Sequence, residues 1–228
     1  MKTYDTFLFD ADNTLFDYDR AEENALRTMF DSCGFEYCEN IRTVYREINS
    51  KVWADYEEGK ITKDVLQVLR FSRLFEKIGV KSDAKDFNNR YLFELGKGSF
   101  LIEGAFEICG EISSRSKKIY IVTNGILATQ ESRIRHSRIR DFIAGYFVSE
   151  FVGFNKPDPK YFEYVFSHIE NPDRGKALII GDSLTADIAG GINAGIDSCW
   201  FNSANADNMT GIRPTYTINR LDELKKFI

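Results

Sequence analysis

The chain has 228 residues, 43% of them hydrophobic, and a formal net charge of −5. This length and composition allow a packed core, either as one large domain or as a core with an insertion. Nothing in this acidic balance resembles the basic footprint of a protein that binds polymeric nucleic acid, so we do not expect such a partner. A small anionic substrate is compatible with it where local donors or a metal offset the repulsion.

Neither a membrane nor a zinc site is expected. No apolar run reaches membrane-spanning length, and the N-terminus lacks the hydrophobic region of a signal peptide. The four cysteines form no C-x-x-C pair, and there are only two histidines. We therefore expect a cytoplasmic protein with free thiols, the alternative being that the four cysteines pair. The expected oligomeric state is a monomer or a dimer.

The predicted elements begin with a buried strand from Tyr4 to Phe9. The segment that follows has apolar residues at helical spacing and no clear strand. Its predicted helices run over 20–33, 41–58, 62–79 and 83–95.

After the Gly-Lys-Gly-Ser segment at 96–99, predicted strands and helices alternate. The strands are 118–123, 146–149, 177–180, 197–201 and 215–218, and the helices are 126–136, 159–169, 186–194 and 221–227. Alternation of this kind is typical of a parallel sheet with helices on both faces. We predict an α/β protein: a Rossmann-like core of residues 1–16 and 97–228, with an all-helical domain, residues 17–96, inserted after the first strand.

Asp10 and Asp12 directly follow the first strand. Side chains at i and i+2 share a face of an extended segment, so both carboxylates can approach one substrate. Such a pair can divide the work of a nucleophile and a general acid/base, or it can hold Mg²⁺. The alternative is an ordinary turn, because Asp and Asn are turn residues.

Chemically suited residues also follow the later strands, where ligands of open parallel sheets bind. Thr123, with the amides at Asn124 and Gly125, is predicted to bind phosphate oxygens, unless this is only a strand-to-helix turn. Lys156 is predicted to neutralise both nucleophile and phosphate, although a single lysine is usually solvated. Asp182 is a candidate Mg²⁺ ligand, and Asp187 either completes that site or orients the lysine.

Four motifs carry a resemblance: D-A-D-N-T from Asp10, T-N-G from Thr123, K-P-D-P from Lys156 and G-D-S-x-x-x-D ending at Asp187. In order and placement they resemble the motifs of the haloacid dehalogenase superfamily, and the helical insertion is similar to its C1 cap. The resemblance implies a phosphatase core domain that uses Mg²⁺ and an aspartate nucleophile. It also implies that the backbone carbonyl of Asp12 is a metal ligand.

Segments over nearly the whole chain are similar to pyrimidine 5′-nucleotidases: 10–19 (DADNTLFDYD), 53–62 (WADYEEGKIT), 171–174 (NPDR) and 214–218 (PTYTI). This implies hydrolysis of nucleoside monophosphates. The family pattern usually has an acidic residue at Phe151, which leaves the exact substrate preference open. A phosphatase or mutase acting on sugar or other small phosphates is the main alternative. A dehalogenase is disfavoured because Asp12 is present, and a phosphate-binding module without catalysis because the whole set is intact.

Two further groups are open to two interpretations. The aromatic residues of the insertion, Trp53, Tyr56, Phe71 and Phe75, could stack on a nucleobase, but most of them are expected simply to fill its core. Trp53, Tyr56 and Glu57, at or near the loop between the middle helices, are the candidates for substrate specificity. The arginines at 133, 135, 138 and 140 are expected to form a solvated helix face rather than to steer phosphate.

Overall fold

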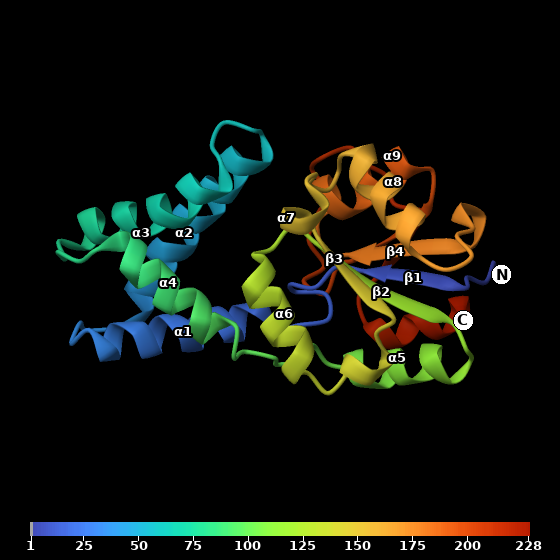
Figure 1. The fold of residues 1–228 in the computed structure, drawn as a ribbon, viewed down its shortest axis with the longest axis horizontal. Helices are drawn as coiled ribbons and strands as arrows, with labels where there is room; N and C mark the ends of the chain where they lie inside the picture. Colours follow the sequence, from blue (N-terminus) through green and yellow to red (C-terminus); the bar gives the residue numbers. More distant parts are fainter. Residues whose placement is uncertain (1) are drawn as a thin grey trace. The chain divides into compact units, whose positions relative to one another are not determined.

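Six parallel strands form the sheet of the protein in a computed structural model that describes residues 2–228 (Figure 1). Their spatial order is β3-β2-β1-β4-β5-β6, so the first strand of the chain lies inside the sheet. The strands are β1 (Thr6–Phe9), β2 (Lys118–Thr123), β3 (Gly145–Val148), β4 (Ala177–Gly181), β5 (Asp197–Phe201) and β6 (Tyr216–Ile218). The predicted α/β class with a parallel, Rossmann-like sheet is confirmed.

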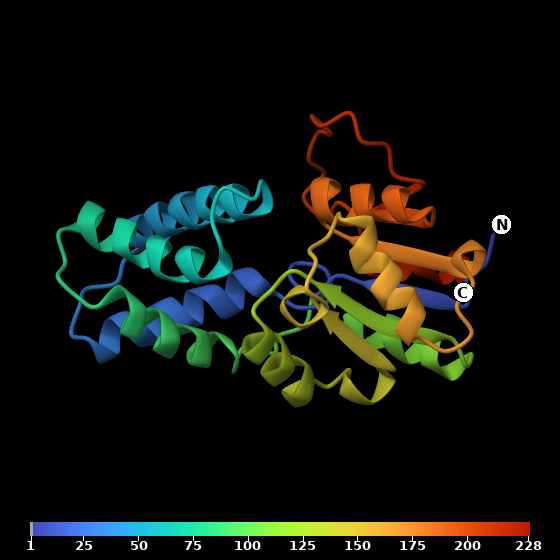
Figure 2. The ribbon, with the colours of Figure 1, turned by 45° about the horizontal axis from the view of Figure 1, so that its top comes forward.

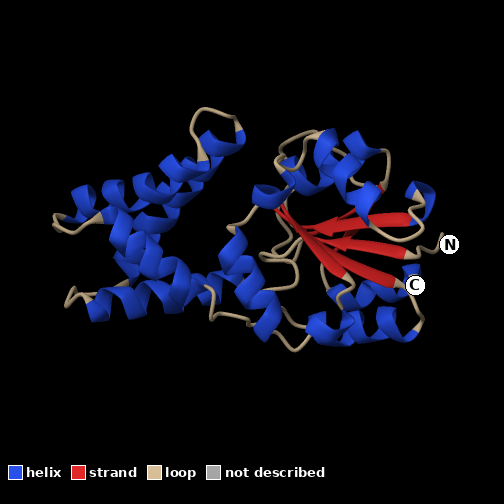
Figure 3. Cartoon of the chain, viewed as in Figure 1, coloured by secondary structure: helices blue, strands red, loops and turns tan. Residues whose placement is uncertain are grey.

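Helices cover both faces of this sheet (Figure 3). Phe7 and Phe9 of β1 pack in one buried cluster with Ile108 of α5, whereas Leu8 packs in a second cluster with Phe162 of α8. The alternation follows from the two-residue period of a strand. The α-helices of this part are α5 (Ala105–Ser114), α6 (Leu127–His136), α7 (Ser149–Val152), α8 (Pro159–His168) and α9 (Ala189–Ala194). It also contains three 3₁₀ helices, η1 (Arg140–Phe142), η2 (Arg174–Lys176) and η4 (Leu221–Phe227), and a π-helical turn, η3 (Leu184–Ile188).

The chain divides into two compact units, Met1–Tyr18 with Ser99–Ile228 and Asp19–Gly98. The first holds the sheet, and we call the second the helical unit. Its helices are α1 (Tyr18–Ser32), α2 (Glu39–Glu57), α3 (Lys63–Ile78) and α4 (Ala84–Leu95) (Figure 2).

Local capping sets the ends of α3. The Thr62 hydroxyl accepts a hydrogen bond from the N–H of Val65 (3.4 Å), and Gly79 ends the helix with a φ of 71°. Phe71 and Phe75 are buried, as expected, and the Phe71 ring lies 4.8 Å from that of Phe87, centroid to centroid. The helical unit therefore has an aromatic core of its own.

Helix α5 was not among the predicted elements. Its N-terminal cap is Gly104, with no side-chain hydrogen bond, so the usual Ser, Thr, Asp or Asn signal is missing.

No helix of the described residues is long and apolar enough to cross a bilayer.

Candidate active site

The carboxyl ends of β1, β2 and β4 lie side by side. The last residue of β1 is in register with Ile121 of β2 and with Ile180 of β4. The backbone N–H of Asp10 donates to the carbonyl of Ile180 (2.8 Å), which continues the sheet by one residue. Asp10, Thr123 and Asp182 are therefore brought to one edge of the sheet, where ligands of such folds bind.

Lys156 is the centre of this site. The residue is 3% exposed, and its Nζ donates to Asp10 Oδ1 (2.6 Å), Asp187 Oδ1 (2.6 Å) and the carbonyl of Val122 (2.8 Å). An ammonium has three donors, so all of them are used and the lysine is held in one direction. Asp10 Oδ2 accepts no hydrogen bond from the described residues, so this oxygen is left for another partner.

The charges of this buried group depend on one another. Burial raises the pKa of Asp10 well above its usual value, repulsion from Asp187 and Asp182 adds to the rise, and Lys156 acts in the opposite direction. Burial alone would lower the pKa of Lys156, but the charges of Asp10 and Asp187 outweigh it and raise that pKa. The lysine is therefore a fixed positive charge beside a crowded carboxylate.

The segment after β2 supports the lysine. The Asn124 side chain donates from Nδ2 to the Lys156 carbonyl (2.9 Å) and accepts from the Lys156 N–H (2.8 Å), just before a cis peptide bond to Pro157. The Gly125 N–H donates to the Thr123 hydroxyl (3.1 Å). Asn124 and Gly125 were predicted to bind phosphate; both have hydrogen bonds inside the protein, so that role stays a prediction.

Asp12 is held by a different helix. Its Oδ1 pairs with Arg133 Nη1, and its Oδ2 accepts from Gln130 Nε2 (2.7 Å), both on α6. The expectation of a solvated Arg133 is wrong, since this side chain is completely buried. Sequence reasoning missed both partners; the signal was their spacing of three residues in a helix that follows T-N-G, which places them on one face.

Three carboxylates can share a cation. Oxygens of Asp10, Asp182 and Asp187 lie within 4.8 Å of one another. Burial and repulsion from Asp187 raise the pKa of Asp182 to about 7, although its side chain reaches solvent. A divalent cation would relieve this crowding, and carboxylate oxygens suit Mg²⁺, so the residues fit that metal. The Asp12 carboxylate is not in this group, and its backbone carbonyl stays a predicted ligand.

Asp187 has a second partner besides Lys156. Its Oδ2 accepts from the Ser183 N–H (3.1 Å), and the residue is 1% exposed. A Cβ at Gly181 would lie 2.1 Å from the same Oδ2, so only glycine leaves room for the carboxylate. Of the two roles considered for Asp187, the structure contains the contact that orients Lys156.

The predicted specificity residues belong to the helical unit. Trp53 and Tyr56 are half-buried near the end of α2, with ring centroids 5.7 Å apart, and Glu57 is exposed. Their role in recognition stays a prediction.

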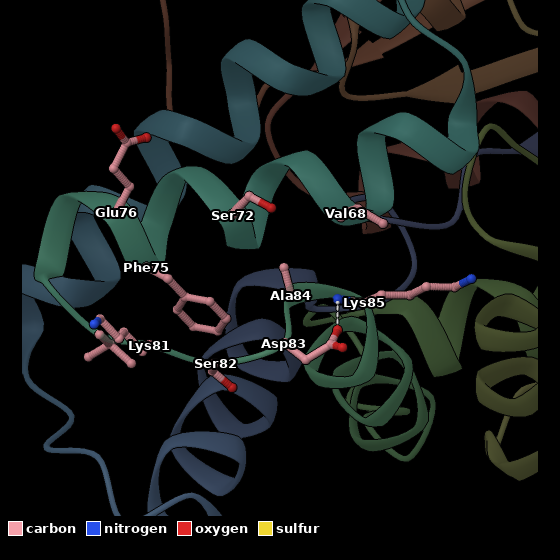
Figure 4. A pocket seen from close by; sticks show the side chains of 10 residues that line it. Val68, Ser72, Phe75, Glu76, Lys81, Ser82, Asp83, Ala84 and Lys85 are labelled. Carbon is pink, nitrogen blue, oxygen red and sulfur yellow. Dashed lines mark hydrogen bonds between the residues drawn. The ribbon is translucent and has the colours of Figure 1, made fainter.

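A hollow of about 510 Å³ opens in the helical unit beside α3 and the start of α4 (Figure 4). Asp83, which lines it, accepts from the N–H groups of Lys85 and Asp86 and so caps α4. The carboxylate and lysine groups at the sheet edge do not line it.

Comparison with known proteins gives a consistent result. A family model described as haloacid dehalogenase-like hydrolase matches residues 4–195. YfnB of Bacillus subtilis is 42% identical, over 98% of this chain and 95% of its own length. The pyrimidine 5′-nucleotidase PynA of Streptococcus pneumoniae is 37% identical, over 97% of this chain and 93% of its own, and the pyrimidine 5′-nucleotidase YjjG of Escherichia coli is 34% identical, over 99% and 98%.

A solved structure of a relative is similar to this chain over its full length. YfnB, in a crystal form bound to magnesium that reveals interdomain movement, matches this chain with a TM-score of 0.93 at 41% identity. The match covers 99% of this chain and 98% of that one. The similarity in sequence and in fold therefore extends over the full length of this chain.

Proposed function

The chain belongs to the haloacid dehalogenase-like hydrolases and is a phosphoric monoester hydrolase, and from this premise we propose that it is a Mg²⁺-dependent nucleoside 5′-monophosphatase that prefers pyrimidines. The observation that carries the catalytic part is the buried bridge of Lys156 between Asp10 and Asp187. A lysine held in this way stabilises negative charge where a nucleophilic carboxylate and a phosphate must meet.

Asp10 is the nucleophile of the proposed reaction. Its Oδ2 forms a bond to phosphorus while the bond from phosphorus to the ester oxygen breaks, which leaves an aspartyl phosphate. Lys156 keeps Asp10 Oδ1 in place during this step (2.6 Å). The Thr123 hydroxyl, which already accepts from the Gly125 N–H, is left with its own hydrogen for a phosphate oxygen.

Asp12 is the proton carrier. In the first step it gives a proton to the leaving ester oxygen, and in the second it takes one from the water that attacks the aspartyl phosphate. Phosphate is then released and Asp10 is restored. Asp12 lies two residues after Asp10, and its charge is among those that raise the pKa of Asp10, so the two carboxylates are neighbours.

The carboxylates of Asp10 and Asp182 are the proposed metal ligands, and Asp187 completes the acidic group. The backbone carbonyl of Asp12 is a further proposed ligand. Bound Mg²⁺ supplies positive charge that offsets the repulsion between Asp10 and the phosphate oxygens. The YfnB crystal form is bound to magnesium, which supports magnesium as the metal.

The substrate class is supported by two relatives named pyrimidine 5′-nucleotidases, each matched over more than nine tenths of this chain. In this proposal the helical unit acts as a cap, and Trp53, Tyr56 and Glu57 contribute to base recognition. Aromatic rings such as those of Trp53 and Tyr56 can stack on a base.

The test is a phosphatase screen with Mg²⁺ over nucleoside, sugar and small-acid phosphates. We expect uridine and thymidine monophosphates to be hydrolysed faster than purine nucleotides or hexose phosphates. Equal kcat/KM across the panel would contradict the pyrimidine preference, and a preference for hexose phosphates would favour the sugar-phosphate alternative.

A further inference from the structure

Two buried residues of α6 hold the carboxylate of Asp12. Arg133 contacts Oδ1, and Gln130 donates to Oδ2 at 2.7 Å. Gln130 also accepts a hydrogen bond from Arg133 Nη1 (3.4 Å), so the two holders are joined to each other. Both oxygens of Asp12 are therefore fixed from one helix face.

The environment of Arg133 points to a purpose beyond packing. Its side chain has no exposed surface, which is costly for a charge that is always present. The guanidinium lies over the ring of Phe16 (4.8 Å to the centroid), and this contact fixes its plane. The guanidinium pairs with the Asp12 carboxylate, which is itself only partly buried.

Gln130 also borders the phosphate-side loop. A Cβ on Gly125 would lie 2.4 Å from Gln130 Nε2 and 2.9 Å from its Cγ. The glycine of T-N-G therefore leaves space for Gln130, which passes from this loop to Asp12. The side chain of Gln130 therefore lies against the loop after β2 and also donates to Asp12.

We propose that Gln130 and Arg133 are positioning residues that orient Asp12 for proton transfer, an inference that rests on the proposed function. A general acid or base must lie within about 2.6–3.2 Å of the atom with which it exchanges a proton. A short carboxylate on a partly exposed turn has several rotamers, and the two donors on α6 select one of them. Neither residue is required to touch the substrate.

The proposal predicts an effect that depends on the leaving group. A nucleoside oxygen needs a proton as it leaves, whereas p-nitrophenolate leaves without one. Gln130→Met and Arg133→Met should therefore slow the single-turnover release of uridine from its monophosphate by about 10²-fold, as expected for lost acid catalysis. The burst of p-nitrophenol from p-nitrophenyl phosphate should change by only a few-fold, and KM should stay near the wild-type value.

Three controls separate positioning from general damage. Arg135→Met removes an exposed arginine of the same helix and should leave both rates unchanged. Arg133→Lys keeps a charge and should recover part of the uridine rate. In an Asp12→Asn background, Gln130→Met should have no further effect on uridine release, because the group it positions is gone. Should Arg133→Met fail to fold, Gln130→Met leaves the arginine in place and carries the same test.

Equal slowing of both substrates in a folded variant would overturn the proposal, as would a further loss in the Asp12→Asn background. A crystal structure of Gln130→Met gives a readout that does not depend on activity. We expect the Asp12 side chain to turn away from its wild-type direction, and an unchanged direction would overturn the proposal even if the enzyme proved to have another substrate. A wild-type protein inactive on every phosphate ester would instead refute the proposed function.

Discussion

Lys156→Met removes the cation from the buried site with little change in side-chain length. It leaves Asp10 and Asp187, which are 8% and 1% exposed, without the partner that bridges them at 2.6 Å each. Breaking a buried ion pair by removing one partner costs about 3–5 kcal/mol. For a chain of this size the expected fall in Tm is about 6–20 °C, at about 2–4 °C per kcal/mol.

The loss should depend on pH. Burial already raises the pKa of Asp10, and Lys156→Met removes the largest influence that opposes this rise. The folded variant then binds more protons than the unfolded chain above the unfolded pKa of about 3.9, so its stability falls as pH increases. The difference from the wild type should thus be small near pH 4 and largest at pH 8.

Urea unfolding followed by circular dichroism, in EDTA at several pH values, measures this difference. Lys160→Met is the matched control, since Lys160 is exposed and lies four residues further along; it should cost less than about 1 kcal/mol. Adding Asp187→Asn to Lys156→Met should restore part of the loss, because one of the two uncompensated charges is removed. A loss below about 1 kcal/mol at pH 8, or one that does not change with pH, would refute this account of the site.

Three other predictions follow from the same carboxylates. Asp10→Asn should abolish phosphatase activity and leave the far-UV circular dichroism unchanged; a wild-type rate would rule out Asp10 as nucleophile. EDTA should abolish phosphatase activity and added Mg²⁺ should restore it, so full activity in the presence of EDTA would contradict the metal assignment. Since the pKa of Asp182 is raised to about 7, the metal-free protein should lose stability as pH rises from about 4 to 7. Asp182→Asn should make the dependence of Tm on pH less steep, and an unchanged dependence would contradict the raised pKa of Asp182.

The strand ends could be predicted because their signals are local. The apolar run before Asp10 is short and bounded by turn residues, and the same holds for the run before Thr123. The rule for parallel sheets then places such residues at one edge without any knowledge of side-chain contacts. Lys156 was expected there for the same reason, and it lies there.

The partners of Asp12 could not be predicted in this way. An arginine on a helix is usually solvated, and periodicity does not say which element faces it. Arg133 contacts Asp12, in the segment after β1, although the two residues are 121 positions apart in the sequence. Its burial depends on this tertiary contact, which periodicity does not reveal. Asn124 is similar: its amide holds the backbone of Lys156, 32 positions away, and this contact exists only once β2 and the segment before α8 have come together.

The order of strands has a consequence for synthesis on the ribosome. β1 is made first, yet one of its two neighbours, β4, begins only at Ala177. Until then the nascent chain has a hydrophobic strand with one open edge, which is a site for mispairing. The helical unit, built from contacts within Asp19–Gly98, can be completed during this interval. Fragments that stop before β4 should therefore be more prone to aggregation than fragments that stop after β5.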